Sequence, residues 1–346
     1  MVTADKTPTI NDVAKAAGVS KRTVSRVINH STKVNAQTRE RVEEAIRRLN
    51  FAPNRQARGL ASRRSYLVGL VYDLPTLFIA DIQKGILNGL YGSGYELIVH
   101  TRHPDDDKVV DDVLQFVSRT KTDGLLLAPP VSEIAELAEA LNDIGCFYLQ
   151  FSSQLSAEPW KQVVTNYLPA ITDMTAHLVD HGHRHFGFIS GPRDNISSQK
   201  RQEAFIQALK QYGLKLPQSL IVEGAFTYDS GMKAAENLLS RPDRPTAIFA
   251  GNDEMAFGVM NVADSMGIDI PRDLSVVGFD GTAFANFVIP SLSTIRRQPN
   301  AMAQLGASKL IARINEGQDA ARAFETMVSP EFVPRESTGP ASLERR

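Results

Sequence analysis

The sequence contains one cysteine and no long apolar run. Cys146 has no second cysteine with which to form an internal disulfide, and no segment approaches the roughly 18 consecutive apolar residues that a membrane span needs. The N-terminal residues also lack the basic stretch and the apolar core of a secretion signal. We therefore expect a soluble protein of the reducing cytoplasm that has no membrane partner.

Motifs of common enzyme classes are missing as well. There is no G-x-S-x-G nucleophile elbow, no Walker A phosphate loop and no H-E-x-x-H zinc motif. The histidines of the HGHRH segment, His181, His183 and His185, alternate as metal ligands on one strand face can. We interpret them instead as part of a loop that leads into a strand. We expect no enzyme activity, no cofactor and no bound metal.

The chain as a whole has no excess of charge of one sign, but the two signs are unevenly distributed. The formal net charge is −1, yet the first 66 residues contain 14 basic and 5 acidic side chains, and the rest of the 346-residue chain contains 24 and 34. A small basic segment joined to a larger acidic body is typical of a protein in which only the basic part binds a polyanion. The length is enough for two or three domains.

The basic segment contains a helix-turn-helix pattern. Thr9 can cap a first helix, Gly18 can end it with positive φ, and Ser20 can cap a second helix. The second helix of such a pair places its first residues against base edges in the major groove, where Arg and Lys favour guanine. On composition alone its polar face could equally be a solvated surface, but its position after the glycine turn favours DNA binding. That face consists of Lys21, Arg22, Thr23, Ser25 and Arg26.

A third helix and a short basic segment follow. Asn35 is the expected cap of this helix, and its inner stripe is Val42, Ala45, Ile46 and Leu49. The next segment contains Gly59 and should be a poor helix on its own. Its apolar Leu60 has no evident core to join, so this segment could also be a plain linker with a buried anchor residue.

These segments resemble the DNA-binding head and hinge of the lactose-repressor/galactose-repressor (LacI/GalR) family. The resemblance is carried by TINDVAKAAGVSKRTVSRVIN and VNAQTRERVEEAIRRLNFAPNRQARGLA, and continues in GLVYDLP, LVDHGHRHFGFISGP, PTAIFAGNDEMAFGV and DLSVVGFDGT. It implies that the hinge folds into a helix on DNA and that Leu60 wedges into the minor groove. The further DNA contacts that it implies are Thr9, Ser20, Asn29, Asn54, Arg55, Ala57 and Arg58.

The body is predicted to be α/β. Apolar strand-like runs alternate with helical stretches such as 82–91 and 198–212, which predicts parallel sheets with helices on both faces. The predicted strands are 67–71, 96–100, 124–128, 146–151, 185–190, 220–223, 247–250 and 275–279. Behind an all-α head, the resemblance implies a two-lobed, periplasmic-binding-protein-like body.

Three segments are expected along the chain. They are a head at 1–53, a hinge at 54–64 and a body at 65–340. The N-lobe of the body should contain about 65–165 and 298–327, and the C-lobe about 166–297 and 328–340. The chain should therefore cross between lobes near Thr165, near Arg297 and Gln298, and near Val328.

Polar residues follow several predicted strands, at the edge where ligands of open α/β sheets bind. Carboxylate, amide and guanidinium groups there can hold polyhydroxyl ligands by paired hydrogen bonds, although each alone could equally be a loop cap. Asp253 is expected to support the cleft loop rather than to contact ligand. With the resemblance, these positions predict an effector site of Tyr72, Asp73, Phe78, Ile79, Gln150, Arg201, Phe226, Asn252, Asp280 and Arg297.

Three residues depart from the pattern of the family. Gln150 and Tyr167 stand where aspartate is frequent, and Arg297 stands where many members have glutamine. Arg297 could bind an anionic ligand or pair across the lobes. The resemblance therefore leaves the chemical nature of the effector open.

The sequence thus predicts a homodimeric repressor of carbohydrate-utilisation genes. It should bind a pseudo-palindromic operator in double-stranded DNA and respond to a small sugar-type effector between its lobes. The alternative within the family is a regulator with a purine or sugar-phosphate corepressor. An enzyme fused to a DNA-binding head would need one of the missing catalytic motifs, and a sugar-transport binding protein would give no reason for the basic head.

Overall fold

The computed structural model describes residues 8–28, 33–51, 64–73, 75–102 and 108–341. The chain forms two compact units, Met1–Tyr66 and Leu67–Arg346. None of the helices in the described ranges is long and apolar enough to cross a bilayer. The predicted DNA contacts that lie outside the described residues are Asn29, Asn54, Arg55, Ala57, Arg58 and Leu60.

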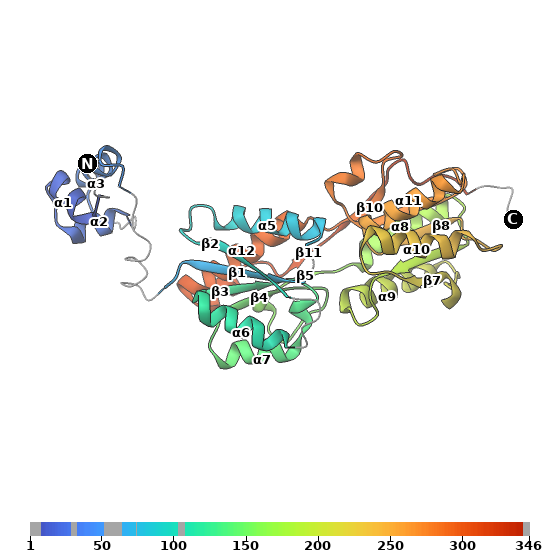
Figure 1. Ribbon diagram of the computed structural model, residues 1–346, viewed down its shortest axis with the longest axis horizontal. Helices are drawn as coiled ribbons and strands as arrows, with labels where there is room; N and C mark the ends of the chain where they lie inside the picture. Colours follow the sequence, from blue (N-terminus) through green and yellow to red (C-terminus); the bar gives the residue numbers. More distant parts are fainter. Residues whose placement is uncertain (1–7, 29–32, 52–63, 74, 103–107, 342–346) are drawn as a thin grey trace, which may run out of the picture. The chain divides into compact units, whose positions relative to one another are not determined.

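In its described residues, the first unit contains the packed helices α1 (Ile10–Ala17), α2 (Lys21–Ile28) and α3 (Ala36–Arg48) (Figure 1). Gly18 ends α1 at a φ of 66°, a left-handed conformation that glycine adopts at little cost. The Oγ of Ser20 accepts the N–H of Thr23 at 3.1 Å, and the Oδ1 of Asn35 accepts the N–H of Thr38 at 2.8 Å. The predicted helix-turn-helix head is confirmed, and its core includes Val13, Val24, Val27 and Val42.

The N-lobe of the second unit is built on a parallel six-stranded sheet with the order β11-β5-β4-β3-β1-β2. The strands are β1 (Leu67–Tyr72), β2 (Glu96–Thr101), β3 (Gly124–Leu127), β4 (Tyr148–Ser152), β5 (Gln162–Thr165) and β11 (Met327–Val328). Two helices cover each face: α5 (Leu77–Leu90) with α12 (Pro299–Glu316), and α6 (Val109–Thr120) with α7 (Ala135–Asp143) (Figure 1). Shorter helices are η1 (Val131–Glu133), η2 (Pro159–Lys161) and α13 (Gln318–Arg322).

The C-lobe is built on a second six-stranded sheet with the order β12-β10-β9-β8-β6-β7, in which only β12 is antiparallel to its neighbour. The strands are β6 (Phe186–Ser190), β7 (Ile221–Glu223), β8 (Ala247–Ala250), β9 (Ser275–Asp280), β10 (Ser293–Arg296) and β12 (Glu331–Val333). The helices are α8 (Leu168–Asp180), α9 (Ile196–Gln211), α10 (Tyr228–Leu239) and α11 (Asp253–Ser265), with short η3 (Gln218–Leu220) and η4 (Ala283–Asn286).

The central strands of the C-lobe are buried along their whole length. Every residue of β6, β8 and β9 is buried, because α10 and α11 pack on one face of the sheet and α8 and α9 on the other. The chain passes between the two sheets three times, after β5, after β10 and after β11. The α/β prediction is confirmed, and the functional consequence is that strand ends of both sheets meet at one place.

Helices α5 and α12 pack at very close range in the N-lobe. A Cβ atom at Gly85 would lie 2.2 Å from the main-chain oxygen of Asn300 and 2.8 Å from the Cβ of Ala303. Both neighbouring atoms are held by a helix and cannot rotate away. The glycine is therefore required by the distance between the helices rather than by its own backbone conformation.

We predict that Gly85→Ala destabilises the protein by about 1–3 kcal/mol, because the added methyl forces the two helices apart. Helix propensity alone predicts the opposite sign, since alanine is favoured over glycine within a helix by about 1 kcal/mol. The measurement is thermal unfolding of the full chain followed by circular dichroism, with the exposed Lys84→Ala on the same helix as control. A Tm for Gly85→Ala at or above that of the parent would show that the helices separate without cost.

Candidate functional site

The exposed face of α2 carries the side chains predicted to bind DNA. Lys21 and Arg22 are exposed, whereas the helix buries Val24 and Val27 against the rest of the head. Thr23, Ser25 and Arg26 are half-buried on the sides of the helix. The first turn of α2 therefore presents two exposed cations, and the first turn is the part of a recognition helix that meets base edges.

Two hydroxyl residues predicted to contact DNA lie at helix starts. The N–H and the hydroxyl of Thr9 both donate to Oδ2 of Asp12, at 2.8 and 2.7 Å. The hydroxyls of Ser20 and Thr23 lie 2.9 Å apart. Thr9 and Ser20 are both exposed, although they form the N-terminal ends of α1 and α2. Each therefore remains accessible to a phosphate of the DNA backbone.

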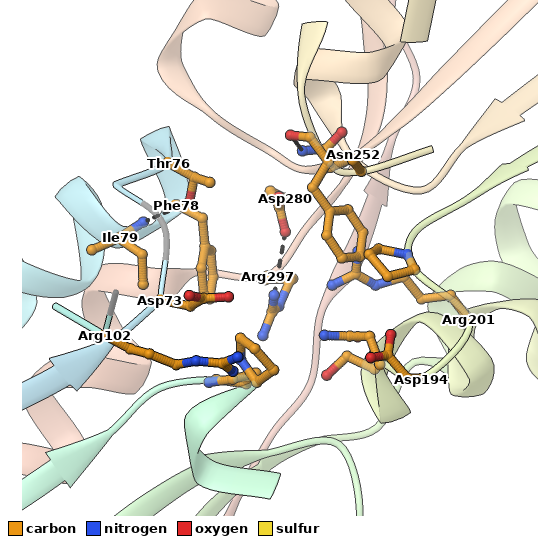
Figure 2. A pocket seen from close by; sticks show the side chains of 17 residues that line it. Asp73, Thr76, Phe78, Ile79, Arg102, Asp194, Arg201, Asn252, Asp280 and Arg297 are labelled. Atoms are coloured by element: carbon orange, nitrogen blue, oxygen red, sulfur yellow. Dashed lines mark hydrogen bonds and ion pairs between the residues drawn. The ribbon is translucent and has the colours of Figure 1, made fainter. Parts of the chain in front are cut away.

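The body contains a cavity of about 290 Å³ at the carboxyl ends of strands from both sheets (Figure 2). This volume lies near the lower end of the roughly 300–1,000 Å³ range of small-molecule sites, so it suits a compact ligand. Eight of the ten predicted effector residues line it: Asp73, Phe78, Ile79, Arg201, Phe226, Asn252, Asp280 and Arg297.

Asp280 is the last residue of β9 and lies at the C-lobe wall of the cavity. It is 7% exposed, and its Oδ1 accepts a hydrogen bond from Nη1 of Arg297 at 3.3 Å. Burial raises the pKa of this carboxyl, and the positive charges of Arg201 and Arg297 oppose the rise. The strand end thus holds a desolvated acceptor beside the ligand space, which strengthens any hydrogen bond that it accepts.

Arg201 is fixed against aromatic rings on the same wall. Its guanidinium carbon lies 4.1 Å from the ring centroid of Phe279 and 5.4 Å from that of Phe226. Its Nη1 donates to the main-chain oxygen of Gly251. The flat guanidinium is therefore held in one orientation before any ligand arrives, which reduces the entropy that binding would cost.

Asn252 shapes the cavity through one accepted and one donated hydrogen bond. Its Oδ1 caps α11 by accepting the N–H of Met255 at 2.9 Å, and its Nδ2 donates to the main-chain oxygen of Phe226 at 2.8 Å. Phe226 itself has a φ of 59°. Asn252 therefore keeps the aromatic wall in an otherwise unfavourable backbone conformation.

Two apolar side chains of the N-lobe wall lie near a buried cation. The Phe78 ring centroid lies 4.0 Å from the guanidinium carbon of Arg297, and Ile79 is 4% exposed. Arg297 is also 4% exposed, and Tyr167 lies 5.6 Å from the same guanidinium. Arg297 is therefore sandwiched between the lobes beside Asp280.

The remaining two predicted effector residues do not line the cavity. Gln150 lies within β4, and its Nε2 donates to the main-chain oxygen of Ser132 at 2.7 Å, which turns the amide toward the η1 segment. Tyr72 ends β1 and is 6% exposed.

The cavity also contains residues that the sequence prediction missed, including Thr76, Arg102, Asp194, Asn195 and Ser197. Arg102 follows β2 directly, so its place after a strand was the available signal.

Asp253 supports the loop that carries Asp280, as expected. Its carboxylate accepts the N–H and the hydroxyl of Thr282 at 2.7 and 2.9 Å and the hydroxyl of Thr294 at 2.5 Å. It is 1% exposed and does not line the cavity. Burial, reinforced by the nearby charge of Asp280, raises the pKa of Asp253 to about 7 despite these three hydrogen bonds.

Two carboxylates bridge the lobes beside the cavity. Glu133 of the N-lobe accepts the N–H of Ile196 at 3.1 Å and the hydroxyl of Ser197 at 3.0 Å, at the first turn of α9. Glu254 of the C-lobe accepts the N–H of Leu77 at 3.3 Å, at the first turn of α5. Burial raises the pKa of both carboxyls. Each lobe thus places an acidic side chain at a helix N-terminus of the other, where backbone N–H groups and the helix dipole favour it.

The histidines of the HGHRH segment take part in structural hydrogen bonds. His183 is 1% exposed, with its ring nitrogens 3.0 Å from the Thr246 hydroxyl and 3.0 Å from the main-chain oxygen of Gly339, and burial lowers its pKa to about 4. His181 bonds the main-chain oxygen of His177 through Nδ1 at 2.7 Å. Across the described part of the chain, no group of three or more His, Cys, Asp or Glu side chains could hold a metal ion.

Comparisons with known proteins match both units of the chain. The family model "Bacterial regulatory proteins, lacI family" matches residues 9–54, and the model "Periplasmic binding protein-like domain" matches residues 175–338. The catabolite control protein A of Priestia megaterium is 37% identical over 290 residues, which are 83% of this chain and 86% of that protein. The HTH-type transcriptional repressor PurR of Edwardsiella ictaluri is 34% identical over 339 residues, 95% of this chain and 96% of the relative.

Solved structures match along nearly the whole length. A complex of the transcriptional regulator CelR with cellobiose is 28% identical with a TM-score of 0.69, over 95% of this chain and 99% of that one. A lac repressor dimer bound to operator and the anti-inducer ONPF is 26% identical with a TM-score of 0.79, over 96% of this chain and 100% of that one. The likeness therefore extends over the head and the body.

The raised pKa of Asp253 predicts a pH-dependent stability. The unfolded chain releases this proton near pH 4, whereas the folded protein keeps it until about pH 7. The stability contribution of the protonated carboxyl is therefore full below pH 4 and is lost as the pH rises to about 7. Relative to Asp253→Asn, the free energy of unfolding of the parent should fall over this range, by at most about 1.4 kcal/mol per pH unit.

The measurement is urea unfolding of the full chain at several pH values, followed by far-UV circular dichroism. The exposed Asp229→Asn in the first turn of α10 is the matched control, and it should track the parent. Parallel pH profiles for the parent and Asp253→Asn would mean that Asp253 is ionised throughout and that its three hydrogen bonds outweigh its burial.

Proposed function

The chain belongs to the LacI family of bacterial regulatory proteins, and we propose that it represses carbohydrate-utilisation genes under the control of a small polyhydroxyl effector. Its relatives are DNA-binding transcriptional repressors, so the chain is a transcriptional regulator and not an enzyme. As a further part of the proposal, it acts in the cytoplasm, where the operator DNA is located. The alternating polar and aromatic groups of the cavity are the observation that supports a carbohydrate effector.

Several features of the cavity suit a small carbohydrate. Asp73 and Asp280 supply carboxylates, Arg201 supplies a fixed guanidinium, and Phe78 and Phe226 supply aromatic walls. Hydroxyl groups both donate and accept hydrogen bonds, so a polyol can satisfy carboxylates and guanidinium groups at once. The cellobiose bound to the related CelR regulator supports the same class of ligand.

A purine or sugar-phosphate corepressor is the second candidate. The identity to the PurR repressor favours it, as do the two phenylalanine walls, against which a flat base could stack. The two candidates differ in their effect on DNA, because a corepressor raises operator affinity and an inducer lowers it. Operator binding measured with each ligand that binds the protein separates them.

A second copy of the chain is the proposed partner on DNA. Each recognition helix reads only a few base pairs, so a pseudo-palindromic operator needs two heads. The body exposes large apolar side chains that a two-fold interface could cover, among them Leu87 and Tyr91 on or next to α5 and Phe287 and Ile289 after η4. The related lac repressor was solved as a dimer on operator, which supports this assembly.

We predict that Arg22→Ala weakens operator binding by about 1–3 kcal/mol and relaxes specificity at one symmetric base pair, because a bidentate contact to guanine is lost. The measurement is binding to a set of operators with single base-pair changes. Lys15→Ala removes the same charge from the exposed face of α1 and is the control. If Arg22→Ala weakens binding to every sequence equally, Arg22 contacts a phosphate and does not read a base.

We predict that Asp280→Asn lowers effector affinity at least about tenfold, because the buried carboxylate gives the stronger hydrogen bonds. Asparagine tolerates the φ of 109° at this position, so the loop should keep its course. Operator binding without effector should be nearly unchanged. The measurement combines isothermal titration calorimetry with operator binding, and Asp229→Asn serves as control. Full effector affinity in Asp280→Asn would place the site elsewhere.

A further inference from the structure

Three arginine side chains extend toward the cavity of the body. Arg102 follows β2 in the N-lobe, Arg201 lies on α9 in the C-lobe, and Arg297 follows β10 (Figure 2). In each of them the Nε atom is buried and has no hydrogen-bond partner within the described part of the chain. Folded proteins pair nearly all buried N–H groups. Arg313 shares this feature outside the cavity, but three of the four arginines with an unpaired Nε gather around one cavity, which suits a ligand rich in acceptors.

Three aspartates line the cavity together with the three arginines, but among the described residues only Asp280 forms an ion pair with one of these arginines. Arg201 and Arg297 are each 4% exposed and share the charge of Asp280, and Glu133 also interacts electrostatically with Arg201. Among the described residues, neither Asp73 nor Asp194 forms an ion pair with an arginine of the cavity. A buried guanidinium group without a direct carboxylate partner is costly, because its desolvation is not offset by pairing.

The buried phenol of Tyr167 responds to the same charge. Burial raises the pKa of the Tyr167 phenol, whereas the positive charges of Arg297 and Arg201 lower it. Together with hydrogen bonds, these charges outweigh burial, so the pKa lies below its ordinary value. The Tyr167 ring lies 5.6 Å from the guanidinium of Arg297 and 5.4 Å from that of Arg201. An acidic group held near these two cations is thus favoured in its charged form.

We propose, building on the repressor function argued above, that the effector is an acidic monosaccharide derivative whose anionic group binds between Arg102 and Arg297. Carboxylate and phosphate share the chemistry that this pair recognises, since both accept paired hydrogen bonds from a planar guanidinium. The sugar hydroxyls donate to Asp280 and to Asp73, whose Oδ1 is buried without a partner among the described residues. The volume of about 290 Å³ fits a single ring better than an oligosaccharide.

The position of the two arginines links anion binding to lobe closure. Arg102 belongs to the N-lobe, and Arg297 lies where the chain leaves the C-lobe after β10. An anion held by both adds an attraction across the cleft, next to the bridges of Glu133 and Glu254. A neutral sugar of the same shape cannot supply this attraction, because it has no negative charge to pair with Arg102.

The test is isothermal titration calorimetry of the full chain with matched pairs of ligands. The pairs are D-glucuronate with D-glucose, D-galacturonate with D-galactose, D-gluconate with sorbitol, and D-glucose 6-phosphate with D-glucose. At least one acid should bind tenfold or more tightly than its neutral counterpart. The identity of that acid shows whether the site recognises a carboxylate or a phosphate. Equal or tighter binding of the neutral member overturns the inference but leaves the proposed function in place.

Two other results also decide the matter. Binding of hypoxanthine or guanine, with no response to any sugar or acid, overturns both the inference and the proposed carbohydrate function. No binding of any acid in the panel rejects the inference, because uronates, aldonates and hexose phosphates are the class proposed.

A substitution of Arg102 tests whether this residue causes the preference for the acid over the neutral ligand. Arg102→Gln should lower the affinity for the acid at least tenfold and leave the affinity for the neutral counterpart within twofold, so that the preference disappears. Arg193→Gln is the matched control, because Arg193 is exposed and pairs with Glu223 at 2.9 Å outside the cavity. Equal losses for acid and neutral ligand in Arg102→Gln, at an unchanged Tm, would show that Arg102 only shapes the cleft and would overturn the assignment.

Discussion

The pairing of buried charges at the carboxyl edge of the C-lobe sheet is the constraint on which the cleft depends. Asp280 and Arg297 are both almost completely buried and pair at 3.3 Å, and Arg201 lies close to the same carboxylate. Removing one member would leave the others desolvated and unpaired, which is costly. The aromatic rings of Phe78 and Phe279 then fix where the guanidinium groups can lie. The binding groups are therefore positioned before a ligand enters.

Contacts between the two lobes lie beside the cavity. Glu133 bonds the start of α9 and Glu254 bonds the start of α5, so each lobe contributes one carboxylate to the other. The three crossings of the chain join the two lobes. A ligand can shift the balance between two arrangements only through its different affinity for them. Contacts that reach both lobes are the ones that provide such a difference.

The resemblance to a family guided the site prediction, and the structure refined it through local bonding. Gln150 follows the same pattern as the residues that line the cavity, yet its amide turns away to the main chain of Ser132. Arg102 was missed because its strand, β2, is partly exposed and the residues that follow it gave no family motif. Which side chain of a strand end reaches a cavity depends on the bonds it makes with loops from elsewhere in the chain, and a pattern of residue types does not contain those bonds.

The sequence by itself determined the helical head and the buried parallel strands, because caps, the turn at Gly18 and continuous apolar runs act over a few residues. It did not predict β5, β10, β11 and β12, which are two to four residues long; β10 also contains the polar residues Ser293, Thr294 and Arg296. These segments become strands only because distant partners hold them, as β9 and β12 hold β10. Tertiary structure alone decided which charges share the cleft, since charge pairing depends on distance in space and not on distance along the chain.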